Sequence, residues 1–221
     1  MKNSRLVQLS LLLLSVACTL VAEGQSGKSK SATQYLNEDF TDGTVLFKNG
    51  STRKASLNLN VLSGKIIFSQ NGKYLELVNA ETIDTVFIGN RKFIKNEGVF
   101  IEVLVTGPLA LYRQYKGSLM SPAKSAGYGT TSQTSSITSL STMNTPTVTY
   151  DMKLPDGYTV DLSYVNWMRL ADKMSSFVNE RQLLKLFPGK EEKIREYIRK
   201  SKTDFSDSAS LVLLVKELAK Y

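Results

Sequence analysis

The sequence predicts a mainly β, α+β fold, in which an antiparallel β-meander forms a barrel-like or sandwich-like domain and two to three short helices follow it. Three observations lead to this prediction. From Thr44 onward apolar and polar residues alternate, which is the period of strands. Turn dipeptides of the Asn-Gly kind recur at short intervals in the same region. From residue 179 onward, apolar residues instead recur at helical spacing.

The chain begins with the features of a cleavable secretory signal peptide. Lys2 and Arg5 give it a positive start, and the stretch over residues 6–22 is apolar and uncharged. Small residues stand at the two positions that a signal peptidase reads, which predicts a cut between Gly24 and Gln25, with a cut after Ala22 as the alternative. We therefore expect an exported protein, located in the periplasm, in the outer envelope or outside the cell.

Two other interpretations of this segment stay open. Cys18 is preceded by a sequence that resembles a bacterial lipobox, although Ser15 stands where leucine is usual. The apolar stretch is also 17 residues long, which is the lower limit for a membrane-spanning helix. Membrane association is thus expected only if Cys18 is lipidated or the signal is retained.

The composition of the predicted mature chain excludes several kinds of chemistry. Removing residues 1–24 leaves 26 basic and 19 acidic side chains, a net charge of +7 that is spread along the chain without a basic stripe. This distribution does not predict nucleic-acid binding, which needs clustered phosphate contacts. The chain has no His, and its single Cys lies in the signal. We therefore expect no cofactor, no Cys/His metal site and no thiol or imidazole catalysis.

The predicted β-meander occupies residues 35–117, after a flexible polar leader over residues 25–34. Dipeptides such as Asn49-Gly50 and Asn71-Gly72 accommodate the positive φ angles of tight hairpin turns, so they mark chain reversals. The strands predicted between these turns are 44–48, 52–62, 65–69, 73–78, 83–89, 91–95, 98–106 and 109–116.

A Ser/Thr-rich loop is predicted over residues 118–147, where 15 of the 30 residues are Ser or Thr. We interpret it as a surface loop, with a binding or assembly segment as the alternative. Further strands at 148–153, 158–162 and 173–178 complete the β region, which ends at residue 178. An aromatic patch within it consists of Tyr158, Tyr164 and Trp167, and such a patch either packs in a core or stacks on a sugar or base.

The C-terminal segment, residues 179–221, is predicted to be helical. Asn179 caps a helix over 180–187 that stops at Pro188, and a second helix covers 190–201. Ser206 or Asp207 caps the last helix. An apolar stripe on this last helix is expected to face the core of its own domain, and its members are Leu211, Leu214, Val215 and Leu218.

Carboxylates are the remaining candidates for catalysis. Three groups of acids stand near strand ends or turns: Glu38 with Asp39, Glu81 with Asp84, and Glu97 with Glu102. A carboxylate-dependent glycan hydrolase needs two acids facing each other across a cleft. Acids scattered over turns are ordinary surface instead, so we assign no catalytic residue.

Several segments together resemble a type of uncharacterised exported protein of Bacteroidota with a β-rich domain and a short helical tail. The resemblance is carried by four stretches, which are Asp42-Gly43-Thr44-Val45 with Phe47-Lys48-Asn49-Gly50, Ile88-Gly89-Asn90-Arg91-Lys92-Phe93, Leu183-Leu184-Lys185-Leu186-Phe187-Pro188, and Ile194-Arg195-Glu196-Tyr197-Ile198. It implies a Gram-negative envelope location and no functional residues. Two tripeptides, beginning at Asp84 and Asp207, also resemble the O-glycosylation pattern of such proteins, which makes Thr85 and Ser208 candidate sites.

The function expected from the sequence is that of a non-enzymatic envelope protein, a binding or assembly module for an envelope protein or a glycan. The coexistence of an export signal, many strands and few reactive side chains motivates this expectation. The alternatives are the carboxylate-dependent glycan hydrolase and, if Cys18 is modified, a lipid-anchored surface protein.

Overall fold

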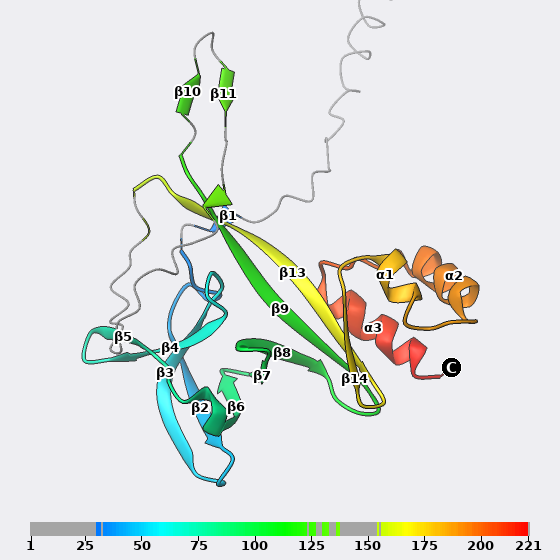
Figure 1. Cartoon of the computed structure of the whole chain (residues 1–221), viewed down its shortest axis with the longest axis horizontal. Coiled ribbons are helices and arrows are strands. Elements are labelled where there is room, and N and C mark those ends of the chain that lie inside the picture. The colour runs from blue at the N-terminus through cyan, green and yellow to red at the C-terminus, as the bar shows by residue number, and fades with distance from the viewer. Residues whose placement is uncertain are drawn as a thin grey trace, which may run out of the picture.

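Twelve strands of the described chain form one antiparallel sheet, in the order β1-β13-β9-β8-β7-β6-β2-β3-β4-β5, with β14 beside β13 and β12 beside β9 (Figure 1). This computed structural model describes residues 30–31, 33–122, 124–126, 130–132, 136–137, 154 and 156–220. The two ends of the strand order, β1 and β5, do not pair, so the sheet is open. The predicted fold class, mainly antiparallel β with short C-terminal helices, is confirmed.

The strands of this sheet are β1 (Lys30–Ser31), β2 (Thr41–Phe47), β3 (Thr52–Asn60), β4 (Lys65–Gln70), β5 (Lys73–Glu76), β6 (Ile83–Ile88), β7 (Arg91–Asn96), β8 (Val99–Val105), β9 (Leu109–Met120), β12 (Ser136–Ile137), β13 (Thr159–Leu170) and β14 (Lys173–Phe177). A separate hairpin consists of β10 (Lys124–Ala126) and β11 (Thr130–Ser132). The helices are α1 (Glu180–Leu184), α2 (Glu191–Ser201) and α3 (Ser208–Leu218).

The sheet consists of two meanders, β2 to β5 and β6 to β9, that join through pairing of β2 with β6. The predicted hairpins within each meander are present. At the turn between β4 and β5, Asn71 and Gly72 both have positive φ, as tight two-residue turns require. Where the meanders join, Gly43 allows close approach of the backbones, because a Cβ there would lie 2.3 Å from the carbonyl oxygen of Phe87.

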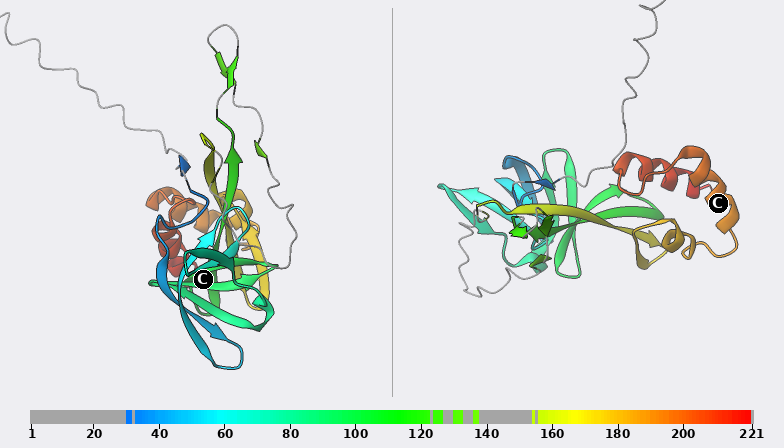
Figure 2. Two further views of the ribbon diagram at one scale, coloured as in Figure 1. Left: turned by 90° about the vertical axis from the view of Figure 1, so that its left-hand side faces the viewer. Right: turned by 90° about the horizontal axis from the view of Figure 1, so that it is seen from above.

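A long antiparallel pair of strands, β9 and β13, connects the curled part of the sheet to the helices (Figures 1 and 2). We call this pair the hairpin, although β10 to β12 lie between its two strands in the sequence. The two strands pair over their whole length, from Thr159 opposite Met120 to Leu170 opposite Leu109. The strands predicted at 109–116 and 158–162 were too short. Both faces of β13 carry apolar residues, so the period of two is weak there, and pairing with β9 determines its length. The predicted strand at 148–153 lies outside the described residues.

The predicted leader is described from its residue Lys30, and part of it belongs to the sheet. Lys30 and Ser31 form β1 and pair with Asp161 and Val160 of β13. Farther along, Leu36 donates a backbone hydrogen bond to Leu59, and Val61 donates one to Gln34. Regular structure thus begins before Tyr35, where the sequence placed its start.

Two larger apolar cores lie at opposite ends of the hairpin, and a small third cluster of Ile101, Ala110 and Tyr112 lies on the other face of β8 and β9. The first fills the curled sheet and contains Val45, Leu57, Leu59, Ile66, Val86, Ile88, Phe93, Phe100, Tyr115, Leu119 and Val160. The second lies between the sheet and the helices and contains Leu109, Leu111, Met168, Phe177, Leu183, Ile194, Ile198, Leu211, Leu214, Val215 and Leu218. Alternate residues of β9 enter both cores, so this strand belongs to both packing units.

The helical caps follow the sequence. The Asn179 side chain accepts a hydrogen bond from the backbone N–H of Gln182, and Asp207 accepts from Ala209 and Ser210. The helix α1 ends at Leu184, earlier than the predicted 187, and a turn leads from it to Pro188. The predicted apolar stripe of α3 is buried in the second core. The helical segment is therefore packed on the sheet as an integral layer.

Candidate functional site

A row of polar side chains crosses one face of the sheet between the two cores. Glu102 on β8 lies opposite Arg113 on β9, and Asn166 on β13 lies opposite Arg113 from the other side. Opposed residues of neighbouring strands share a face. This face also carries Tyr115, two residues along β9, so apolar strands bring charged groups together in the interior.

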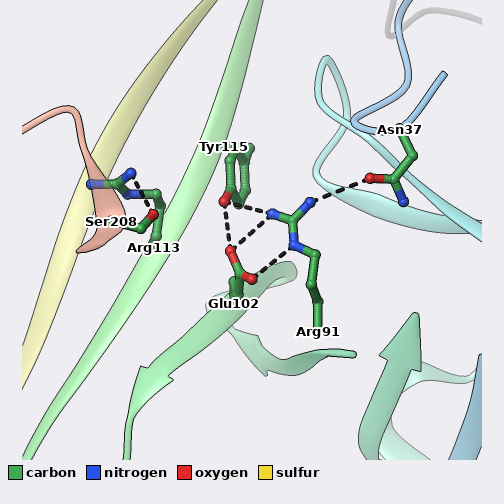
Figure 3. Close-up of polar contacts among 6 residues, drawn as sticks. All are labelled: Asn37, Arg91, Glu102, Arg113, Tyr115 and Ser208. Atoms are coloured by element: carbon green, nitrogen blue, oxygen red, sulfur yellow. Dashed lines mark hydrogen bonds and ion pairs between the residues drawn. The ribbon is translucent and has the colours of Figure 1, made fainter. Parts of the chain in front are cut away.

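Arg91, Glu102 and Tyr115 form a closed hydrogen-bonded group in this row (Figure 3). The Arg91 guanidinium donates to both carboxylate oxygens of Glu102, with Nε to Oε1 at 2.8 Å and NH2 to Oε2 at 2.9 Å. It also donates to the Tyr115 hydroxyl at 2.6 Å. That hydroxyl donates to Glu102 Oε2 at 2.5 Å, and Asn37 Oδ1 accepts from Arg91 NH1 at 3.3 Å. The Glu102 side chain is 9% exposed and that of Arg91 is 25% exposed.

Burial and the hydrogen bonds within this group determine the protonation states of Glu102 and Tyr115. Burial raises the pKa of Glu102, but the hydrogen bonds from Arg91 and Tyr115 outweigh burial and leave the pKa below its ordinary value. Burial raises the pKa of the Tyr115 hydroxyl far above its ordinary value. Glu102 is therefore ionised at neutral pH while Tyr115 keeps its proton, and the pair is suited to holding structure rather than exchanging protons.

Arg113 connects the sheet to the start of the last helix (Figure 3). Its Nε donates to Asn166 Oδ1 at 3.0 Å, and its NH1 donates to the Ser206 carbonyl oxygen and the Ser208 Oγ, both at 2.7 Å. Its NH2 donates to the Phe205 carbonyl oxygen at 3.1 Å. The residue is 2% exposed. A buried guanidinium here satisfies carbonyls of the segment before α3 and fixes the position of that helix on the sheet.

The carboxylates singled out in the sequence do not converge. Glu97 is exposed in the turn after β7, whereas Glu102 is buried against Arg91. Glu81 forms an ion pair with Lys95 at the surface, and Asp84 accepts the hydroxyl of Thr85 at 2.8 Å. Glu38 and Asp39 are exposed and precede β2. None of these three groups forms a pair of facing acids.

The candidate binding site is a groove of about 780 Å³ at the helical end of the hairpin, within the usual volume range for small-molecule sites. Three turns and the end of α3 line it: the β8–β9 turn, the β13–β14 turn and the α1–α2 turn. Most of its lining is apolar, and its members include Pro108, Leu109, Leu170, Leu186, Phe187, Pro188 and Leu218. Arg169, Asp172 and Lys190 supply charges. Leu170 is 43% exposed, so part of the apolar lining is open to solvent.

The predicted modification sites fall in different environments. Thr85 is 4% exposed in β6 and donates its hydroxyl to Asp84, so the folded chain does not present this hydroxyl to a glycosylating enzyme. Ser208 begins α3 as expected, but it is half-buried and accepts a hydrogen bond from Arg113. Cys18, Gly24 and Gln25 lie outside the described residues.

The three residues of the predicted aromatic patch pack against apolar clusters, which agrees with the first of the two alternatives, but they do not gather in one place. Tyr158 packs against the first core, and the Tyr164 ring stands edge-on to that of Tyr115, with Arg113 over it. Trp167, an odd number of residues farther along β13, belongs to the other face and donates to Gln114 Oε1 at 3.1 Å. Strand alternation separates these rings.

The polar row and the groove were both missed by sequence reasoning. A local signal existed for the row, because Glu102 is the one charged residue of Val99–Val105 and Arg113 stands in the apolar first half of Leu109–Met120. The groove had no local signal, because four segments distant in sequence line it.

Among the described residues, no helix has the length and apolar character needed to cross a membrane. The same part of the chain contains no cluster of three or more His, Cys, Asp or Glu suited to a metal ion. Comparisons with protein-family models, with curated proteins and with solved structures found no match.

Proposed function

We propose that this chain is a non-enzymatic, exported envelope protein that acts as a binding module, with the groove as its ligand site. The observation that carries the proposal is the groove itself, an apolar concavity formed where the sheet meets the helices. Sites for small ligands are usually concave and mostly apolar, with a few polar groups that fix orientation. The sequence features of the first 24 residues support export, and the resemblance to exported Bacteroidota proteins supports an envelope location.

The contacts of the polar row support a structural role for these side chains, because they are occupied within the fold. Arg91, Glu102 and Tyr115 satisfy one another, and Arg113 is occupied by the segment before α3. A glycan hydrolase would need two facing carboxylates, and Asp172 is the one acid among the residues that line the groove. The binding module is therefore the better supported of the two functions.

Titration with a neutral fluorescent probe, N-phenyl-1-naphthylamine, tests the proposal on the chain expressed from its full-length reading frame. Ala219 lines the groove at the end of α3, so A219W places an indole in it. We expect A219W to weaken probe binding at least tenfold. The matched control is A209W, which adds the same side chain at an exposed position in the first turn of the same helix. Equal binding by both variants would overturn the proposed site.

A further inference from the structure

One edge of β13 is paired at both of its ends and open between them (Figure 1). On this edge β1 pairs with Val160 and Asp161, and β14 pairs with the residues from Asn166 to Leu170. The opposite edge of β13 pairs with β9 along its whole length. Over residues 162–165, therefore, no described strand lies on the edge that β1 and β14 share.

The backbone groups of Leu162 and Tyr164 face this open edge. Gly117 is the partner of Leu162 on β9, but it donates its N–H to the Val61 carbonyl oxygen at 2.8 Å. Pairs with and without mutual hydrogen bonds alternate in an antiparallel ladder, and the pairing of β13 with β9 has no register shift. Leu162 and Tyr164 thus direct their N–H and C=O groups away from β9, where each group needs a partner.

This edge belongs to the folded body of the protein. The side chains of Leu162 and Tyr164 are half-buried and pack against the first core. An open strand edge is a template on which another strand can pair, and proteins usually cover or shorten such edges. The edge of β13 is therefore a docking surface for a short extended segment.

The register of β1 directs the chain that precedes it along this edge. Lys30 lies opposite Asp161, and the two strands are antiparallel. Counted back from Lys30, residues 26–29 fall opposite residues 162–165 in reverse order. The segment before β1 thus matches the gap residue for residue.

The predicted processing of the chain fits the length of this gap. Continued in the same register, Gln25 would stand opposite Asn166, where Phe177 of β14 already pairs. The signal cut predicted between Gly24 and Gln25 removes the chain before that position. A chain cut there reaches β14 and ends where the gap ends.

We infer that residues 26–29 of the processed chain extend β1 along β13 and close the gap before β14, so that signal cleavage leaves an N-terminus that completes the sheet edge. Ser29 pairs with Leu162 and Gly27 with Tyr164, and each pair exchanges backbone hydrogen bonds. Lys28 lies between them, and lysine on an edge strand discourages pairing with another chain. This edge is separate from the groove, whose lining contains none of these residues.

Amide hydrogen exchange measured by NMR tests this pairing, on isotope-labelled protein that is expressed from the full-length reading frame and processed by the cell. We expect the Leu162 and Tyr164 amides to exchange about a hundredfold more slowly than unstructured amides. The amides of Ser163 and Val165, which face β9, give the reference for a paired position. Intact-mass measurement checks that the processed chain begins at Gln25.

Proline substitutions at two serines of the segment separate pairing from composition. S29P removes the N–H that donates to the Leu162 carbonyl oxygen, so exchange at Leu162 and Tyr164 should accelerate about tenfold. S26P is the matched control, because the N–H of residue 26 points away from β13, where an edge strand tolerates proline. It should change exchange at both amides by less than about twofold. The amides of β2 and β3 report whether each variant is folded.

Several results would contradict this pairing. Fast exchange at Leu162 and Tyr164 in wild type would show that the edge is open, and this measurement decides the point even if S29P does not fold. Slow exchange that S29P leaves unchanged would mean that another part of the chain covers the edge. Protection that appears only at high protein concentration would identify a second copy as the occupant.

Discussion

Glu102 is an ionised side chain inside a β-sheet, and its partners determine whether it stabilises the fold. Each of its oxygens accepts from Arg91, and Oε2 also accepts from Tyr115. A buried carboxylate with such partners keeps its charge. A buried carboxylate without them destabilises the fold, because its desolvation is not compensated. The geometry of these three residues therefore matters more than the presence of a charge.

We expect E102Q to lower the free energy of unfolding by about 3 kcal/mol at pH 7, because the amide leaves the Arg91 guanidinium without a counter-charge in a largely buried site. Urea unfolding measures this loss. The matched control is E38Q, which changes an exposed acid before β2 and should have an effect below about 0.5 kcal/mol.

The pH dependence of the stability difference between wild type and E102Q tests the direction in which the pKa of Glu102 is shifted. The folded-state pKa of Glu102 is lowered, so its contribution is fully present above the unfolded-state pKa of about 4.3 and is lost as pH falls through the lower folded-state value. The stability difference between wild type and E102Q should therefore shrink below about pH 4.3. A difference that stays constant down to pH 3 would contradict this account.

At the scale of elements, Arg113 is the polar connection between strand β9 and helix α3. Its four hydrogen bonds reach Asn166, the carbonyl oxygens of Phe205 and Ser206, and the hydroxyl of Ser208. The apolar contacts of α3 hold the helix against the sheet, and these directional bonds fix the segment before its first turn.

We expect R113K to destabilise the packing of α3 by about 2 kcal/mol, because a lysine ammonium cannot reproduce the planar fork of donors. Hydrogen exchange of the α3 amides should accelerate about thirtyfold, while amides of β2 and β3 change much less. The control is R199K in α2, an exposed position with no such bonds to the sheet. Unchanged exchange in α3 would show that Arg113 does not hold the helix.

Local chemistry in the sequence was sufficient to predict the hairpins and the helix caps. Asn71 and Gly72 adopt the backbone that their types favour, and Asn179 and Asp207 accept the hydrogen bonds expected of N-caps. The length of β13 was not predictable in this way, because a strand with apolar residues on both faces has a weak period. Its pairing with β9, far away in sequence, determines where it ends.

At the scale of the whole molecule, one strand joins both apolar cores. Leu109 and Leu111 of β9 pack with the helices, whereas Tyr115 and Leu119 pack inside the curled sheet. Neither core is complete without this strand. The two cores are therefore expected to unfold together.

We expect L59A in the first core and L211A in the second each to lower the free energy of unfolding by about 2–5 kcal/mol, since both side chains are fully buried. Differential scanning calorimetry should show one transition in wild type and in both variants, moved to lower temperature by either substitution. Two transitions, with only one of them moved by L211A, would show that the helical layer unfolds independently.

The candidate sites belong to this scale, and this is why the sequence did not predict them. The polar row depends on the register that sets Glu102 opposite Arg113, and the groove depends on four segments meeting at one end of a hairpin. Residue types alone indicated charged residues within apolar strands. They did not indicate which charges meet or where a concavity forms.

The sharing of β9 also has a consequence for how the protein is made. Synthesis runs from the N-terminus, so β9 emerges before β13 and the helices that cover it. A chain that has emerged only to Met120 presents Leu109 and Leu111 without the side chains that bury them later, and it presents Arg113 without Asn166 and the carbonyls before α3. The interval before the last third of the chain arrives is thus when a holding chaperone is most needed.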